Sequence, residues 1–168
     1  MMERRMTAVR YFAYALEFFV LHVLSQTPGM LPAIEGIRPV PLIAAAVAAA
    51  LFESEIPSLV FGLSAGLLID FGMGCVLGFH ALILAALCFL ISWLCRNLLR
   101  VNFLTCAAVS LGVCVVLLSL QWVFFVVLAG QSGAGHIYVR YILPRAAYSA
   151  LFCLVVYPIH RGLFSVTG

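Results

Sequence analysis

The sequence predicts an all-α integral membrane protein, a bundle of about six transmembrane helices. Of its 168 residues, 65% are hydrophobic and only 9% are charged, whereas a soluble domain is nearer half apolar and a quarter charged. With a mean hydropathy of +1.20, so much apolar surface cannot be hidden inside a small globule. The apolar runs are continuous, unlike the alternating strands of a β-barrel. Residues 1–168 are therefore expected to form a single transmembrane domain.

The first helix is expected at about residues 9–27, and it has the roughly 20 residues that a membrane span needs. Glu17 and His22 interrupt its apolar stretch and no A-x-A cleavage site follows, so we interpret it as a retained helix and not a cleaved signal. Pro28 and Gly29 end it. For Glu17 and His22 we expect snorkelling or a single interhelical hydrogen bond, since a proton relay would need more intramembrane acids.

The second helix, at about residues 39–54, is short. Pro39 and Pro41 fit its first turn, where no amide donor is lost, and an alanine-rich uncharged run follows. We expect it to be tilted, thinly covered or partly shielded by its neighbours. The third helix, at about residues 56–71, contains one charge, Asp70.

Three further helices are expected at about residues 77–96, 103–129 and 141–160. The fourth ends at Arg96, and the fifth lies in a stretch without any charge between residues 101 and 139. Pro144 falls in the first turn of the sixth helix, where proline is tolerated.

Arginine, the only basic residue besides histidine, suggests the orientation. Cytoplasmic loops carry an excess of arginine, and six spans place both termini on one side. With both termini inside, the inner set is Arg4, Arg5, Arg10, Arg96, Arg100 and Arg161, and the outer set is Arg38, Arg140 and Arg145. We therefore expect both termini in the cytoplasm.

One face of the third helix carries the clearest candidate site. Ser58, Gly62, Gly66 and Asp70 are spaced by four and so share a face, and Gly62 and Gly66 make a GxxxG match, which allows close helix approach. An ionisable group within a span usually faces the bundle interior or water. The face fits either a tight helix contact within the chain, with Asp70 capping or anchored near the interface, or a functional ion pair or partner contact. In the second case Arg38 would be a natural mate for Asp70.

The sequence lacks the residue patterns of several common catalytic and metal-binding sites. No HExxH or HxxxH pattern is present, so a zinc enzyme is not supported. The P-loop lysine cannot exist in a chain without lysine, and no GxSxG nucleophile motif occurs. The six cysteines form no CxxC pair, and those in apolar runs behave as small hydrophobes. We expect a protein that is not an enzyme and holds no cofactor or metal.

The order of segments resembles the bacterial rod shape-determining MreD family. Arg38-Pro39 opens a short helix, a G-x-x-x-G-x-x-x-D helix follows over residues 62–70, and L-G-x-x-x-L follows over residues 77–82, which includes Gly78. This block, residues 38–82, carries the resemblance together with the chain length and the five-to-six-helix layout. Tyr157-Pro158 before a basic end also suits the family.

The resemblance implies a non-enzymatic scaffold of the bacterial cell-elongation machinery in the cytoplasmic membrane. Such proteins act beside an MreC-like protein, an MreB-like actin filament and the peptidoglycan polymerase–transpeptidase pair. A membrane adaptor of this kind would hold a partner's transmembrane helix in a lipid-facing groove. Candidate packing or contact residues are then Arg38, Ser58, Gly62, Gly66, Asp70 and Gly78.

The alternative is a substrate-binding membrane subunit of a vitamin or small-molecule uptake transporter. A binder should gather polar groups and aromatics on the outer side. The outer loops offer only Arg38, Asp70, His80, His136, Tyr138 and Arg140.

Overall fold

The computed structural model describes residues 2–27, 29–30, 37–73, 76–97, 102–130 and 134–167. These residues are almost entirely helical, and none of them forms a β-strand. The helices are α1 Met2–Gln26, α2 Pro41–Phe52, α3 Glu55–Met73, α4 Phe79–Asn97, α5 Phe103–Trp122, α6 Ala134–Ile137, α7 Leu143–Leu151 and α8 Cys153–Thr167. Pro28 and Arg100, which entered the expected turn and topology, lie outside the described residues.

Five stretches are long and apolar enough to cross a membrane, which confirms the predicted polytopic helical protein. They are Met6–Gln26, Glu55–Met73, Phe79–Asn97, Phe103–Val127 and Gly135–Ser165. The last joins α6, α7 and α8, so it extends at both ends beyond the expected residues 141–160. A π-helical segment, Tyr138–Ile142, precedes Pro144. Proline clashes with the carbonyl four residues earlier in a regular α-helix, and the wider turn relieves that clash.

The short helix α2, which is not among these five stretches, lies at the centre of the bundle. All of its residues from Pro41 to Leu51 are buried, and it contacts α1, α3, α4, α5, α7 and α8. Its 12 residues reach only about 18 Å, compared with a hydrocarbon core of about 30 Å. Of the arrangements that the sequence left open for this short helix, the structure shows shielding, and the neighbours cover it along its whole length. Its many alanines allow those neighbours to approach closely.

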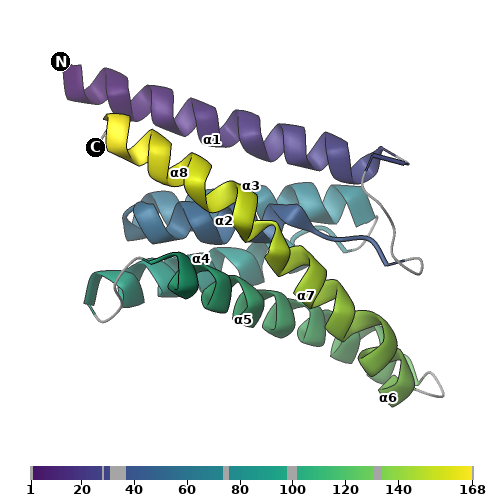
Figure 1. Ribbon diagram of the computed structural model, residues 1–168. Helices are drawn as coiled ribbons and strands as arrows, with labels where there is room; N and C mark the ends of the chain where they lie inside the picture. The colour runs from purple at the N-terminus through teal and green to yellow at the C-terminus, as the bar shows by residue number, and fades with distance from the viewer. Residues whose placement is uncertain are drawn as a thin grey trace.

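The remaining helices surround α2 in two groups. Figure 1 shows α1 and α8 along one side of the bundle and α4 and α5 along the other, with both chain ends at the same end. The helices α3 and α4 form an antiparallel hairpin with extensive mutual contact. Fully buried large side chains from four helices meet around α2; they include Tyr14, Phe18, Leu84, Leu117, Leu118 and Val156.

Candidate functional site

Asp70 lies buried at the end of α3 and holds the beginning of α4. Its Oδ2 accepts a hydrogen bond from the Gly78 amide at 2.8 Å, and its Oδ1 accepts one from the His80 amide at 3.2 Å. The ring Nδ1 of His80 lies 2.6 Å from Oδ1. The carboxyl group thus satisfies amides at a helix amino terminus, as a capping residue does. Gly78 has φ +96°, a conformation that glycine adopts readily.

Asp70 contacts His80 and not Arg38, the mate that the sequence suggested, because the His80 ring occupies the position beside the carboxylate. The packing of α4 against α3 brings His80 beside Asp70, ten residues earlier in the sequence. His80, which looked isolated in the sequence, is fully buried there. Arg38 instead precedes α2, with its side chain exposed at the edge of a separate cavity.

The small residues of α3 face α4. A Cβ atom at Gly62 would lie 2.8 Å from the Leu84 carbonyl oxygen, and one at Gly66 would lie 2.6 Å from the Ala81 nitrogen. Ser58, also buried, donates to the Glu53 carbonyl oxygen at 3.4 Å. The structure therefore brings the face from Ser58 to Asp70 together as packing inside the chain.

A pair of oppositely charged side chains lies at the carboxyl end of α2. Arg10 of α1 forms an ion pair with Glu53, which lies between α2 and α3. The Arg10 Nε atom lies 2.6 Å from Glu53 Oε1, and Arg10 Nη2 donates a hydrogen bond to Glu53 Oε2 at 3.2 Å. Ser92 of α4 donates to the Glu53 carbonyl at 2.7 Å. Burial raises the pKa of the Glu53 carboxyl, and the Arg10 guanidinium opposes that rise. No local spacing in the sequence could have paired residues that lie 43 positions apart.

Glu17 makes an interhelical hydrogen bond, one of the two roles that the sequence suggested for it. His160 Nε2 of α8 lies 2.7 Å from Glu17 Oε2, and the Tyr14 ring stacks on the His160 ring with centroids 4.5 Å apart. The contact ties α1 to the last helix. His160 looked isolated in the sequence because its partner lies 143 residues away.

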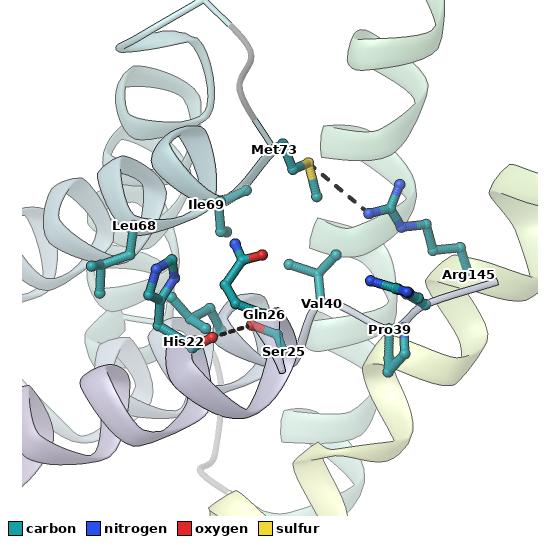
Figure 2. A pocket seen from close by; sticks show the side chains of 12 residues that line it. His22, Ser25, Gln26, Pro39, Val40, Leu68, Ile69, Met73 and Arg145 are labelled. Carbon is teal, nitrogen blue, oxygen red and sulfur yellow. Dashed lines mark hydrogen bonds between the residues drawn. The ribbon is translucent and has the colours of Figure 1, made fainter. Parts of the chain in front are cut away.

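A polar cavity of about 140 Å³ lies at the other end of α1, where α2 begins. Figure 2 shows His22, Gln26, Met73 and Arg145 around it, from three different helices. Arg145 Nη2 lies 4.0 Å from the Met73 sulfur. The described residues that line it are His22, Ser25, Gln26, Arg38, Pro39, Val40, Leu42, Leu68, Ile69, Gly72, Met73 and Arg145.

An apolar groove of about 340 Å³ runs along the outer surface between α5 and α7–α8. It is lined by Phe103, Ala107, Leu111, Ala147, Ala150, Leu151, Cys153 and Leu154. Three alanines form part of its wall, and larger side chains flank them. In the sequence these helices carry only small-residue spacings at residues 108–112 and 146–150, which are common in membrane helices and do not by themselves predict a groove.

The polar contacts described above join one helix to another. In the part of the chain that the structure describes, no group of three or more histidine, cysteine or acidic residues could hold a metal ion. The arrangement is suited to fixing helices at defined positions in the membrane.

Comparison with known proteins places the chain in a family. A family model described as rod shape-determining protein MreD matches residues 6–167, which includes α2 through α8 and nearly all of α1. Comparisons with curated proteins and with solved structures gave no match. The match extends far beyond the block of residues 38–82 that first resembled the family. This multi-pass membrane protein therefore belongs to the MreD family of rod shape-determining proteins.

Proposed function

We propose that the protein is a non-enzymatic membrane adaptor of the bacterial cell-elongation complex, which holds the transmembrane helix of an MreC-like protein in the groove between α5 and α7–α8. Membership of a rod shape-determining family supports the process, and the groove supports the mode of binding. In this proposal both termini face the cytoplasm, as the arginine distribution favours. The MreB-like filament and the peptidoglycan polymerase–transpeptidase pair would be reached through that partner.

The groove fits a helix for two physical reasons. It lies on the membrane-spanning part of α5 and of the last span, where a bound protein segment must satisfy its own backbone hydrogen bonds and is therefore helical. Ala107, Ala147 and Ala150 in its wall let a second backbone approach closely, which is how helices associate in lipid. The Ser58–Asp70 face, by contrast, is covered by α4.

An adaptor acts by favouring one state of its complex. A partner shifts a conformational equilibrium only as far as its contacts differ between the two states. The contact between α2 and the six helices around it supports a fixed groove. A helix bound there would keep one position relative to the bundle and so restrict the positions open to the rest of the complex.

The test is to fill the groove. Ala147→Leu places a larger side chain in its wall, whereas Ala86→Leu enlarges an alanine of α4 that is also exposed but lies outside the groove. Each tagged protein is purified gently from its native membrane, and co-purifying chains are quantified by mass spectrometry. We expect an MreC-like protein with the wild type and with Ala86→Leu, and a recovery roughly tenfold lower with Ala147→Leu, because overpacking a close apolar contact costs about 1–3 kcal/mol.

Two results would refute the proposal. Equal recovery of the partner with both variants would exclude this groove. Recovery of an ATPase pair and a coupling membrane subunit, in place of shape proteins, would instead indicate the uptake-transporter function.

A further inference from the structure

A pocket of about 300 Å³ lies at the end of the bundle where α2 and α8 end and α5 begins. It shares no lining residue with the polar cavity or with the groove between α5 and α7–α8. Its volume reaches the lower limit of small-molecule sites, about 300 Å³. It is lined by Leu51, Phe52, Asn102, Tyr157, Arg161 and Phe164, among which Arg161 carries the one formal charge.

The polar groups of this pocket are not engaged by other described residues. The ion pairs of the described part of the chain do not involve Arg161, and Glu53, which follows Phe52, is bound by Arg10. Tyr157 is only 5% exposed, yet its hydroxyl group makes no hydrogen bond with any described residue. A guanidinium group matches phosphate oxygens with two parallel hydrogen bonds, and a buried hydroxyl group needs a partner.

The two helix ends at the pocket have opposite polarity. Asn102 is the N-cap residue of α5, but its side chain makes no capping hydrogen bond, so the first amides of α5 keep their partial positive charge. Leu51 and Phe52 end α2, where the last carbonyl groups lack partners within the helix and carry partial negative charge. A ligand that joins an anionic group to a hydrogen-bond donor therefore fits this pocket better than a bare anion.

The position of the pocket indicates the kind of molecule that carries these groups. The span Phe103–Val127 begins beside it, and the last span ends at Ser165, about one turn beyond Arg161. Both lie at the end of the bundle that holds the chain termini (Figure 1). The ends of spans coincide with the headgroup region of the bilayer. Leu104 and Phe164 are exposed there and suit contact with acyl chains.

We propose that this pocket binds the headgroup of a phospholipid of the phosphatidylethanolamine type. Arg161 and Tyr157 donate to the phosphate oxygens, and the ammonium group donates to the carbonyl groups at the end of α2. Basic pockets between membrane helices are a known form of headgroup site. The inference needs neither the proposed adaptor function nor the groove between α5 and α7–α8.

The experiment measures thermal unfolding of the full chain in a neutral detergent during titration with one additive. The four additives are dioleoylphosphatidylethanolamine, dioleoylphosphatidylcholine, which has methyl groups in place of the ammonium hydrogens, dioleoylglycerol, which lacks the phosphate, and inorganic phosphate. A ligand that binds only the folded state raises the unfolding midpoint in a saturable way. We expect phosphatidylethanolamine to do so, phosphatidylcholine to need about tenfold more for half the shift, and dioleoylglycerol to have no effect.

Three results with these additives would overturn the proposal. Stabilisation by dioleoylglycerol equal to that by phosphatidylethanolamine would show that the phosphate is not recognised. Inorganic phosphate that stabilises equally well would show a free-anion site and overturn the lipid carrier. Phosphatidylcholine that acts at the same concentration would overturn the role given to the end of α2.

Arginine variants locate the phosphate. Arg161→Gln should raise the phosphatidylethanolamine concentration needed for half the shift about tenfold. Arg161→Lys keeps the charge without the planar fork and should fall between. Arg96→Gln, at an exposed arginine of α4 outside the pocket, is the matched control. The same response from Arg161→Gln and Arg96→Gln would overturn the proposal.

Tyr157→Phe separates binding from folding. The ring contacts with Phe52 and Phe103 remain in this variant, and the hydroxyl that is lost has no described partner, so the unfolding midpoint without lipid should stay at the wild-type value. The phosphatidylethanolamine concentration for half the shift should rise about fivefold, as expected for one neutral hydrogen bond. An unchanged response to the lipid would exclude the hydroxyl from the site and overturn the proposed contact.

Discussion

Replacing Gly66 with alanine should force α3 and α4 apart. A Cβ atom there would lie 2.6 Å from the Ala81 nitrogen and 2.7 Å from the His80 carbonyl carbon, whereas non-bonded carbon atoms attract best at about 3.5–4.0 Å. Both neighbours are backbone atoms, so no side-chain rotation relieves the overlap. The helices must separate by about 1 Å, and the amides that donate to Asp70 move away with α4.

The magnitude follows from three terms. Overpacking costs about 1–3 kcal/mol, and a weakened hydrogen bond to the buried Asp70 carboxyl adds about 1–3 kcal/mol. Alanine returns up to about 1 kcal/mol of helix propensity. We expect Gly66→Ala to lower the free energy of unfolding by about 2–4 kcal/mol, which in a chain of this size corresponds to a fall in Tm of roughly 5–15 °C.

Other glycines supply graded controls. At Gly62 the added Cβ would lie 2.8 Å from the Leu84 oxygen and 2.9 Å from the Ala85 Cα, a milder overlap with a smaller expected loss. At Gly112 of α5 nothing lies within 4 Å, so alanine should be neutral or stabilise slightly through its higher helix propensity.

The assay is thermal unfolding of the purified variants in one detergent, followed by tryptophan fluorescence. The expected order of Tm is Gly112→Ala highest, then Gly62→Ala, then Gly66→Ala. A Gly66→Ala protein with the wild-type Tm would refute the backbone contact between α3 and α4. So would a Gly112→Ala protein destabilised to the same degree.

Three further outcomes are expected from the buried polar groups. Asp70→Asn should lower the free energy of unfolding by about 1–3 kcal/mol in the same assay, because an amide NH₂ replaces an acceptor that faces backbone donors; an unchanged Tm would contradict the cap. Arg10→Gln leaves Glu53 with a pKa raised by burial, so the folded state binds more protons than the unfolded state and stability should fall as pH rises through that raised pKa; the double variant with Glu53→Gln should lose this dependence. Cys106 and Cys153, whose sulfurs lie 2.6 Å apart, should form a disulfide under a membrane-permeant oxidant, and peptide mass spectrometry that finds no such link would contradict the packing of α5 on α8.

Much of the fold could be predicted because lipid imposes a simple rule on sequence. Spanning segments need long apolar runs, and the charges and turn residues that separate them are visible directly. The short run before Glu53 indicated a helix that needs shielding, and α2 is buried. The ends of the last helix were harder to place, since lipid sets a minimum length for a span and not a maximum.

The partners of the buried charges could not be predicted. Asp70 stood out as an ionisable residue in a span, but its mate depends on the packing of α4 against α3 that brings His80 beside it. Glu53 and His160 meet residues of α1 that lie far away in sequence. Such pairs are set by which helices become neighbours, and hydropathy carries no information about neighbours once every helix is apolar.

The short central helix accounts for where these polar groups lie. At about 18 Å, α2 is shorter than the roughly 30 Å hydrocarbon core, so space remains within the bundle beyond one or both of its ends. Backbone groups exposed there would be costly in lipid unless they find partners. At the carboxyl end, Ser58 and Ser92 donate to the Glu53 carbonyl and Arg10 binds its side chain. At the amino end, Ser149 accepts from the Val40 amide at 2.8 Å, and the polar cavity begins. One fully buried helix thus explains why the polar contacts inside the bundle gather at its two ends.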